Sequence, residues 1–172
     1  SSKFRNAGQT CVCANRILVH APVYEEFVRR FVQAVQTLRV GNGLDDGVTQ
    51  GPLIDEAAVR RMEALIADAV THGAHILTGG YPHVRGGLFF MPTVLGDVRP
   101  GMRVAREEIF GPIAPILRFD TEPEAIQMAN DTEYGLAAYF YARDLARVFR
   151  VSEALEYGMV GVNTGTVSAE NA

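Results

Sequence analysis

The pattern that sets the fold class is Arg16-Ile-Leu-Val-His-Ala-Pro-Val-Tyr-Glu-Glu-Phe-Val-Arg-Arg-Phe-Val-Gln-Ala-Val-Gln-Thr-Leu38. Its first five residues have an apolar centre, Ile17-Leu-Val19, and are typical of a buried strand. From Pro22 onward, apolar side chains recur at helical spacing, at Tyr24, Phe27, Val28, Phe31, Val35 and Leu38. The stretch therefore predicts a strand followed by an amphipathic helix, which Gly41-Asn-Gly43 terminates.

The same order of strand and helix continues toward the C-terminal end. Asp55 is expected to cap a second helix, which ends at Gly73. The apolar side chains of this helix are Val59, Met62, Leu65, Ile66, Ala69 and Val70. Thr121-Glu-Pro-Glu124 has the pattern of a capping box, so another helix should run from it to about Asn130.

Asp144 is expected to cap the last helix, which Gly158 ends. Its inward side chains should be Leu145, Val148, Phe149 and Leu155. Extended segments are expected at residues 75–78, 89–98, 113–119, 138–142 and 159–163. Strands that alternate with helices predict an α/β fold with a largely parallel, twisted sheet flanked by helices.

The chain has 172 residues, no repeat and no linker, so we expect one domain over residues 1–172. Gly41, Gly43 and Gly47 resemble a dinucleotide-binding fingerprint only superficially. The third glycine is one position late and the run follows a helix instead of a strand, which favours a simple loop. A domain that binds a nucleotide cofactor is therefore expected outside this chain.

Charge and hydropathy exclude several classes of function. The net charge is −4 with both signs interspersed, and no basic stripe favours nucleic acid. No apolar run has the length that a bilayer requires. Two closely spaced cysteines without an export signal fit a reducing compartment, the cytoplasm or, in a eukaryote, the mitochondrial matrix.

The segment Phe4-Arg-Asn-Ala-Gly-Gln-Thr-Cys-Val-Cys-Ala-Asn-Arg16 holds the only two cysteines of the chain, Cys11 and Cys13. A thiol on a turn, with a cation six positions upstream, suits a nucleophile, because the thiolate is the reactive form. Half of a zinc site is less favoured, since no second pair of ligands follows at zinc spacing. Buried filling is a competing interpretation for either thiol.

Four sequence motifs, of which the cysteine segment is the first, follow one another along the chain. The cysteine segment resembles the cysteine motif of the aldehyde dehydrogenase superfamily, and Glu107-Glu-Ile-Phe-Gly-Pro112 resembles a second motif of that family. Residues 130–136 and 161–163 resemble two more blocks. Within the superfamily, Cys-Val-Cys-Ala-Asn-Arg, residues 137–144 and Asn163-Thr-Gly look most like the succinate-semialdehyde dehydrogenases. The resemblance covers the whole chain and implies a catalytic-domain fragment of a longer enzyme.

The resemblance implies a role for each of several residues. Cys11 corresponds to the nucleophile that attacks the aldehyde carbon. Glu108 and Phe110 correspond to residues that touch the nicotinamide half of NAD or NADP, whereas Glu107 is expected to be structural. Arg5 and Ser168 correspond to residues that grip the far carboxylate of the substrate.

Cys13 has two interpretations of equal weight, packing or a redox partner that closes a disulfide with Cys11. Lys3 and Arg16 are expected to be a helix-end charge and a strand-flank charge, and Asn163 a structural residue. No metal site is expected. The family places an oxyanion donor and the base in the missing domain, so the isolated fragment should not turn over.

Three other functions are kept open. One is oxidation of glutarate semialdehyde or a related semialdehyde, because one methylene is discriminated only modestly. Another is a thiol–disulfide redox module, which the Cys-x-Cys spacing disfavours. The third is a non-catalytic interaction module, whose strand edges and apolar loops are buried against a partner. The expected partners are a small semialdehyde and, as the resemblance implies, further copies of the parent in a dimer or tetramer, with neither nucleic acid nor membrane.

Overall fold

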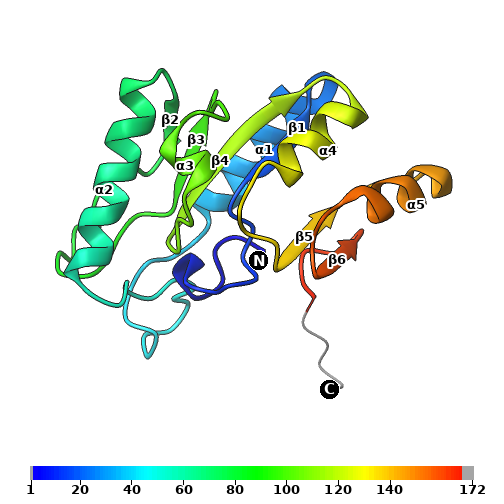
Figure 1. Ribbon diagram of the computed structural model, residues 1–172. Coiled ribbons are helices and arrows are strands. Elements are labelled where there is room, and N and C mark those ends of the chain that lie inside the picture. Colours follow the sequence, from blue (N-terminus) through cyan, green and yellow to red (C-terminus); the bar gives the residue numbers. More distant parts are fainter. Residues whose placement is uncertain (1, 168–172) are drawn as a thin grey trace.

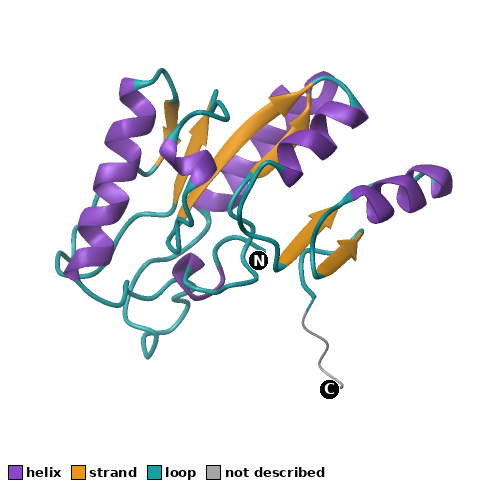
Figure 2. Ribbon diagram, viewed as in Figure 1, coloured by secondary structure: helices purple, strands orange, loops and turns teal. Residues whose placement is uncertain are grey.

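The computed structural model describes residues 2–167 and forms an α/β fold (Figures 1 and 2). The helices are α1 (Tyr24–Gln36), α2 (Glu56–Thr71), α3 (Arg103–Arg106), α4 (Glu122–Asn130) and α5 (Leu145–Ala154), with short 3₁₀ turns η1 (Arg5–Gly8) and η2 (Ala21–Val23). The strands are β1 (Ile17–His20), β2 (His75–Thr78), β3 (Thr93–Gly96), β4 (Ile113–Phe119), β5 (Ala137–Phe140) and β6 (Met159–Val162).

The larger sheet has the strand order β1-β4-β3-β2. β4 runs parallel to both β1 and β3, with Ile17 beside Ile116 and Thr93 beside Ile113, whereas β2 pairs antiparallel with β3. The expected fold class, a largely parallel sheet flanked by helices, is therefore confirmed. One antiparallel edge strand, β2, completes the sheet, and a long turn-rich connection over residues 79–92 joins it to β3.

The central strand β4 is buried on both faces, which explains its continuous apolar sequence. Ala114 and Ile116 pack with residues of α1 in one apolar cluster. Ile113 and Leu117 point the other way, into the cluster built around α2 and α3. The sheet therefore lies between two helical layers, with α2 and α3 on one side and α1 on the other (Figure 1).

β5 and β6 form a separate two-stranded parallel sheet, and α5 connects them (Figure 2). The chain passes into this unit from α4, and Arg16 ties α4 to the segment before β1. Its guanidinium donates to the carbonyl oxygens of Met128 at 2.7 Å and Ala129 at 2.8 Å. A cation is favourable there, because the last carbonyl groups of a helix have no partner within it. Arg16 is thus a structural charge, although it acts on a helix end.

All three predicted caps are confirmed. The side chains of Asp55 and Asp144 accept hydrogen bonds from the backbone N–H groups of Ala58 and Arg147. Thr121 and Glu124 form both bonds of the capping box. Such bonds satisfy donors that the first helical turn leaves free, so local sequence alone specifies where these helices start.

Two inward positions of α5 were predicted wrongly, because Leu145 and Phe149 are 69% and 60% exposed. Val70, near the end of α2, is 45% exposed. The apolar stripe of α5 is only partly covered within residues 2–167, where Val148 and Leu155 are half-buried. In addition, α1 ends at Gln36 ahead of Leu38, only Thr93–Gly96 of the segment 89–98 is a strand, and the short helix α3 was not expected.

Within the described part of the chain, no helix is both long and apolar enough to cross a membrane. The loop that holds Gly41 and Gly43 contains no helix or strand, as its sequence predicts.

Candidate active site

The two cysteines lie on a tight turn between η1 and β1. The N–H of Cys13 donates to the carbonyl oxygen of Thr10 at 2.9 Å, and the N–H of Ala14 donates to that of Ser2 at 2.9 Å. Cys11 is exposed at this turn, and Cys13 is half-buried; both are free thiols. The Cys13 thiol lies 3.7 Å from the carbonyl oxygen of Arg5, to which it donates.

The backbone ahead of the turn is strained. Asn6 and Ala7 have φ values of 51° and 55°, in the left-handed region that side chains with a Cβ rarely adopt. Gln9 helps to hold this backbone in place. Its side-chain oxygen accepts from the N–H of Ile54 at 2.8 Å, and its amide nitrogen donates to the carbonyl oxygen of Pro52 at 3.3 Å.

Gly8 brings the turn against the loop before β4. A Cβ placed on Gly8 would lie 2.2 Å from the carbonyl oxygen of Gly111, and the φ of Gly8 is +75°. Only glycine fits both the conformation and the contact. The cysteine turn and residues 107–111 therefore lie side by side.

Asn15 joins the same two segments through its side-chain amide. Its Nδ2 donates to the carbonyl oxygen of Glu107 at 2.9 Å, and its Oδ1 accepts from the N–H of Ile109 at 2.8 Å. Both backbone groups flank Glu108. The structure therefore brings the segment of Cys11 and the segment of Glu108 and Phe110 together.

Glu107 and Glu108 differ in their ion pairs and in their exposure to solvent. Glu107 is bound by Arg103 at 2.5 Å and by Arg61 at 3.0 Å, and the hydrogen bond from Arg103, against the effect of burial, lowers the pKa of its carboxyl. Glu107 is thus structural, as expected. The neighbouring Glu108 is exposed, and Phe110 is 43% exposed with a φ of 48°.

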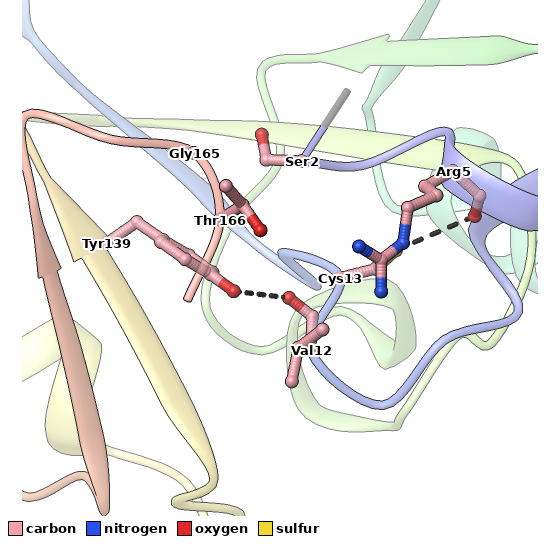
Figure 3. A pocket seen from close by; sticks show the side chains of 7 residues that line it. All are labelled: Ser2, Arg5, Val12, Cys13, Tyr139, Gly165 and Thr166. Atoms are coloured by element: carbon pink, nitrogen blue, oxygen red, sulfur yellow. Dashed lines mark hydrogen bonds between the residues drawn. The ribbon is translucent and has the colours of Figure 1, made fainter. Parts of the chain in front are cut away.

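A small pocket of about 30 Å³ lies beside the turn (Figure 3). Its lining residues are Ser2, Arg5, Val12, Cys13, Tyr139, Gly165 and Thr166. The hydroxyl of Tyr139, from β5, donates to the carbonyl oxygen of Val12 at 2.8 Å. Burial, and then the proximity of Cys13, raise the pKa of this phenol.

The pocket gathers Arg5 and Cys13, but Cys11 does not line it. Ser168 lies outside the described residues. Tyr139 and Asn15 were not singled out from the sequence, although both belong to blocks that carry the family resemblance. Their hydrogen bonds join segments that are distant in the sequence, so no local sequence pattern predicts these bonds.

Lys3 was predicted wrongly as a helix-end charge. It is buried with 3% exposure, and burial lowers its pKa to about 8 against the opposing influence of Cys13. Asn163 is structural, as expected, because its side chain bonds both the N–H and the carbonyl oxygen of Ala142.

The fold and the site define a class: an α/β enzyme domain in which an exposed thiol lies beside a loop that carries a free carboxylate and an aromatic ring. The comparisons with known proteins name it. The model of the aldehyde dehydrogenase family matches residues 1–172, and the chain belongs to that family.

Individual relatives and solved structures show which aldehyde dehydrogenases this chain is similar to. The chain is 61% identical over 172 residues to succinate-semialdehyde dehydrogenase [NADP(+)] of Escherichia coli, covering 100% of this chain and 36% of that protein. It is 60% identical to a glutarate-semialdehyde dehydrogenase of Pseudomonas aeruginosa, covering 99% and 35%. The crystal structure of succinate-semialdehyde dehydrogenase from Burkholderia pseudomallei superimposes with a TM-score of 0.97 at 58% identity, covering 99% and 36%. The chain thus spans about a third of the length of these relatives.

The contact of Gly8 yields a prediction. Gly8→Ala should destabilise the protein by about 3 kcal/mol, because a left-handed alanine and an overlap with rigid backbone both oppose folding. Urea denaturation of the full-length protein, followed by circular dichroism, measures the change. Gly101→Ala is the matched control, since a Cβ there meets no atom within 4 Å. Equal denaturation midpoints for the two variants would show that the Gly8 contact is unimportant.

Proposed function

We propose that this chain is the catalytic-domain portion of an NAD(P)-dependent aldehyde dehydrogenase that oxidises succinate semialdehyde to succinate. The observation that carries the proposal is the position of Arg5. Its guanidinium faces a pocket that Cys13 also lines (Figure 3). Cys13 is two positions along the chain from Cys11. The identity of 61% to a succinate-semialdehyde dehydrogenase supports the same substrate.

In the proposed mechanism, Cys11 is the nucleophile. Its thiolate adds to the aldehyde carbon, and the carbonyl oxygen becomes the oxyanion of a thiohemiacetal. The bound nicotinamide cofactor supplies the acceptor for the hydride that this carbon then loses. The resulting thioester is hydrolysed by water, which releases the carboxylic acid and restores the thiol.

The turn suits the first step. Cys11 is exposed, so an aldehyde reaches its sulfur without rearrangement of the turn. The backbone N–H of Cys11 is proposed to help stabilise the oxyanion, together with donors from the rest of the parent chain. A pocket of about 30 Å³ is far smaller than a typical ligand site of roughly 300 Å³ or more, which supports a site completed by other parts of the parent. The fragment alone is therefore proposed to be inactive.

The loop before β4 fits a nicotinamide cofactor chemically. Glu108 is exposed and makes no ion pair within residues 2–167, so its carboxylate is free to accept from the two hydroxyls of a ribose. Phe110 presents an exposed ring against which a flat heterocycle packs. Glu108 and Phe110 are therefore proposed to hold the cofactor. NAD and NADP are both compatible with these two contacts.

Arg5 is proposed to bind the far carboxylate of the substrate, because a guanidinium pairs with a carboxylate through two parallel hydrogen bonds. Ser168 is proposed to assist it. A carboxylate at the far end is common to succinate and glutarate semialdehydes. Glutarate semialdehyde is the second candidate substrate, favoured by the 60% identity to a glutarate-semialdehyde dehydrogenase. We further propose that the parent is a cytoplasmic homo-oligomer.

The role of Cys11 is tested by substitution in the full-length parent. Cys11→Ala should abolish oxidation of succinate semialdehyde, because the thioester then has no sulfur at the position of attack. Cys13→Ala is the matched control and should retain most of the activity. Absorbance of the reduced cofactor measures both rates. An active Cys11→Ala enzyme would exclude Cys11 as the nucleophile.

The role of Arg5 is tested by the substrate dependence of KM. Arg5→Ala should raise KM for succinate semialdehyde roughly 10- to 100-fold, the loss expected for hydrogen bonds to a charged group. KM for butyraldehyde, which has no carboxylate, should change little. Arg60→Ala, on an exposed ion pair of α2, is the control and should leave both values unchanged. Equal increases for the two aldehydes would refute carboxylate recognition.

Cys13 is proposed to form a reversible disulfide with Cys11 that stops catalysis. Peroxide takes two electrons and two protons from the two thiols, the S–S bond forms, and the peroxide is reduced to water. A reducing cytoplasm keeps the pair as thiols.

Peroxide should therefore inactivate the parent enzyme, and dithiothreitol should restore it. In Cys13→Ala, the part of the inactivation that dithiothreitol reverses should be smaller than in wild type, because Cys11 then has no neighbouring thiol to pair with. Residual activity after matched exposures, with and without reductant, measures this. The switch is ruled out if Cys13→Ala and wild type lose and regain activity alike.

A further inference from the structure

The side chain of Asn15 uses both ends of its amide on one loop. Nδ2 donates to the carbonyl oxygen of Glu107 at 2.9 Å, and Oδ1 accepts from the N–H of Ile109 at 2.8 Å. Rotating the amide by half a turn would set oxygen against oxygen and nitrogen against N–H. The orientation of this side chain is therefore determined by its two partners.

These two bonds fix the peptide groups on either side of Glu108. A third bond fixes the carbonyl oxygen of Glu108 itself, which accepts from Arg61 at 2.7 Å. The direction in which the Glu108 side chain leaves the backbone is thereby set. Next to this segment, Phe110 has a strained φ of 48°, a conformation that persists only where neighbouring contacts enforce it.

The other end of Asn15 is attached to the cysteine turn. Asn15 follows directly after Ala14, whose N–H donates to the carbonyl oxygen of Ser2, and Cys13 closes the turn on Thr10. A shift of the turn is therefore passed to the amide of Asn15 and through it to residues 107–109.

We infer that Asn15 is a positioning residue that holds Glu108 and Phe110 in a fixed place relative to Cys11. The inference rests on the proposed function, in which Cys11 bears the substrate and the Glu108 loop bears the cofactor. Hydride transfer needs the two reacting carbon atoms to be close and aligned, and small displacements lower its rate strongly. Asn15 touches neither ligand and acts through the backbone of the loop.

A purely structural role predicts a different result, and the chain offers a matched control. Asn130 uses its amide in the same way, donating to the carbonyl oxygen of Ala154 at 2.8 Å and accepting from the N–H of Glu156 at 3.1 Å. These bonds join the end of α4 to the residues at and after the end of α5, and neither of them involves the cysteine turn or residues 107–109. Asn130→Ala therefore removes two equivalent bonds while both bonds of Asn15 to the Glu108 loop stay in place.

The experiment compares the full-length enzyme with Asn15→Ala, Asn15→Asp and Asn130→Ala in steady-state assays with succinate semialdehyde. Asn15→Ala should raise KM for the nicotinamide cofactor about tenfold and lower kcat about tenfold, with KM for the aldehyde changed less than about twofold. Asn15→Asp keeps the acceptor for Ile109 but loses the donor to Glu107, and should change the same two constants. Asn130→Ala should leave all three constants at the wild-type values.

The outcomes separate the positioning role from the proposed function. If the wild-type enzyme oxidises the aldehyde and Asn15→Ala matches Asn130→Ala in every constant, the positioning role is overturned and the proposed function stands. If the wild-type enzyme oxidises no semialdehyde with either cofactor, the proposed function fails and the inference fails with it. Should Asn15→Ala not fold, Asn15→Asp decides, since an unchanged cofactor KM in that variant overturns the role.

Discussion

The contact between Gly8 and Gly111 is the constraint on which the geometry of the candidate site depends. It exists because β1 and β4 are parallel neighbours in the sheet, so the segments that precede them leave the same edge. The cysteine turn precedes β1, and the Glu108 loop precedes β4. The two motifs therefore meet as a direct consequence of strand order, and the absence of a Cβ on Gly8 lets their backbones touch.

This arrangement departs from the usual rule for open α/β sheets, in which ligands bind beyond the carboxyl ends of the strands. Here the candidate site lies at the amino ends of two neighbouring strands. The helices that follow β1 and β4 begin at the opposite edge of the sheet, so the N-termini of α1 and α4 do not face the site. In the proposed function, the charged side chains of Arg5 and Glu108 take the place of such helix N-termini in binding ligands.

The features that sequence predicted well are local ones. Asp55, Thr121 and Asp144 bond to N–H groups within their own helices, so a few consecutive residues contain all the information needed to place these caps. The resemblance also singled out Cys11 and Glu108 by the order of its blocks, and the roles of these two residues stay predictions. That their two segments lie side by side is beyond such local patterns, since it requires knowing that β1 lies next to β4.

The features that sequence missed depend on distant partners. Phe149 lies on a clear apolar stripe, but a stripe does not reveal whether the covering surface belongs to the same stretch of chain. Tyr139 reads as a strand aromatic, and only the packing of β5 against the turn gives its hydroxyl a partner in Val12. Lysine is rarely buried, so composition favoured an exposed Lys3.

The conformation of residues 3–15 opposes folding in several ways at once. Asn6 and Ala7 are left-handed, and each such residue costs roughly 1–2 kcal/mol. Lys3 adds a buried charge: its pKa of about 8 lies below its ordinary value, so between these values the unfolded chain binds more protons and stability rises with pH. Below about pH 8 the full burden of the buried ammonium remains.

These unfavourable terms are balanced by bonds to the rest of the chain. Gln9 reaches the loop before α2, Asn15 reaches the loop before β4, and Tyr139 reaches the turn from β5. None of these partners is close in sequence, so the turn gains its stability only when the whole fold has assembled. A peptide of the cysteine segment alone would meet the cost of left-handed Asn6 and Ala7 without any of these bonds, so the conformation of the turn is a property of the assembled fold.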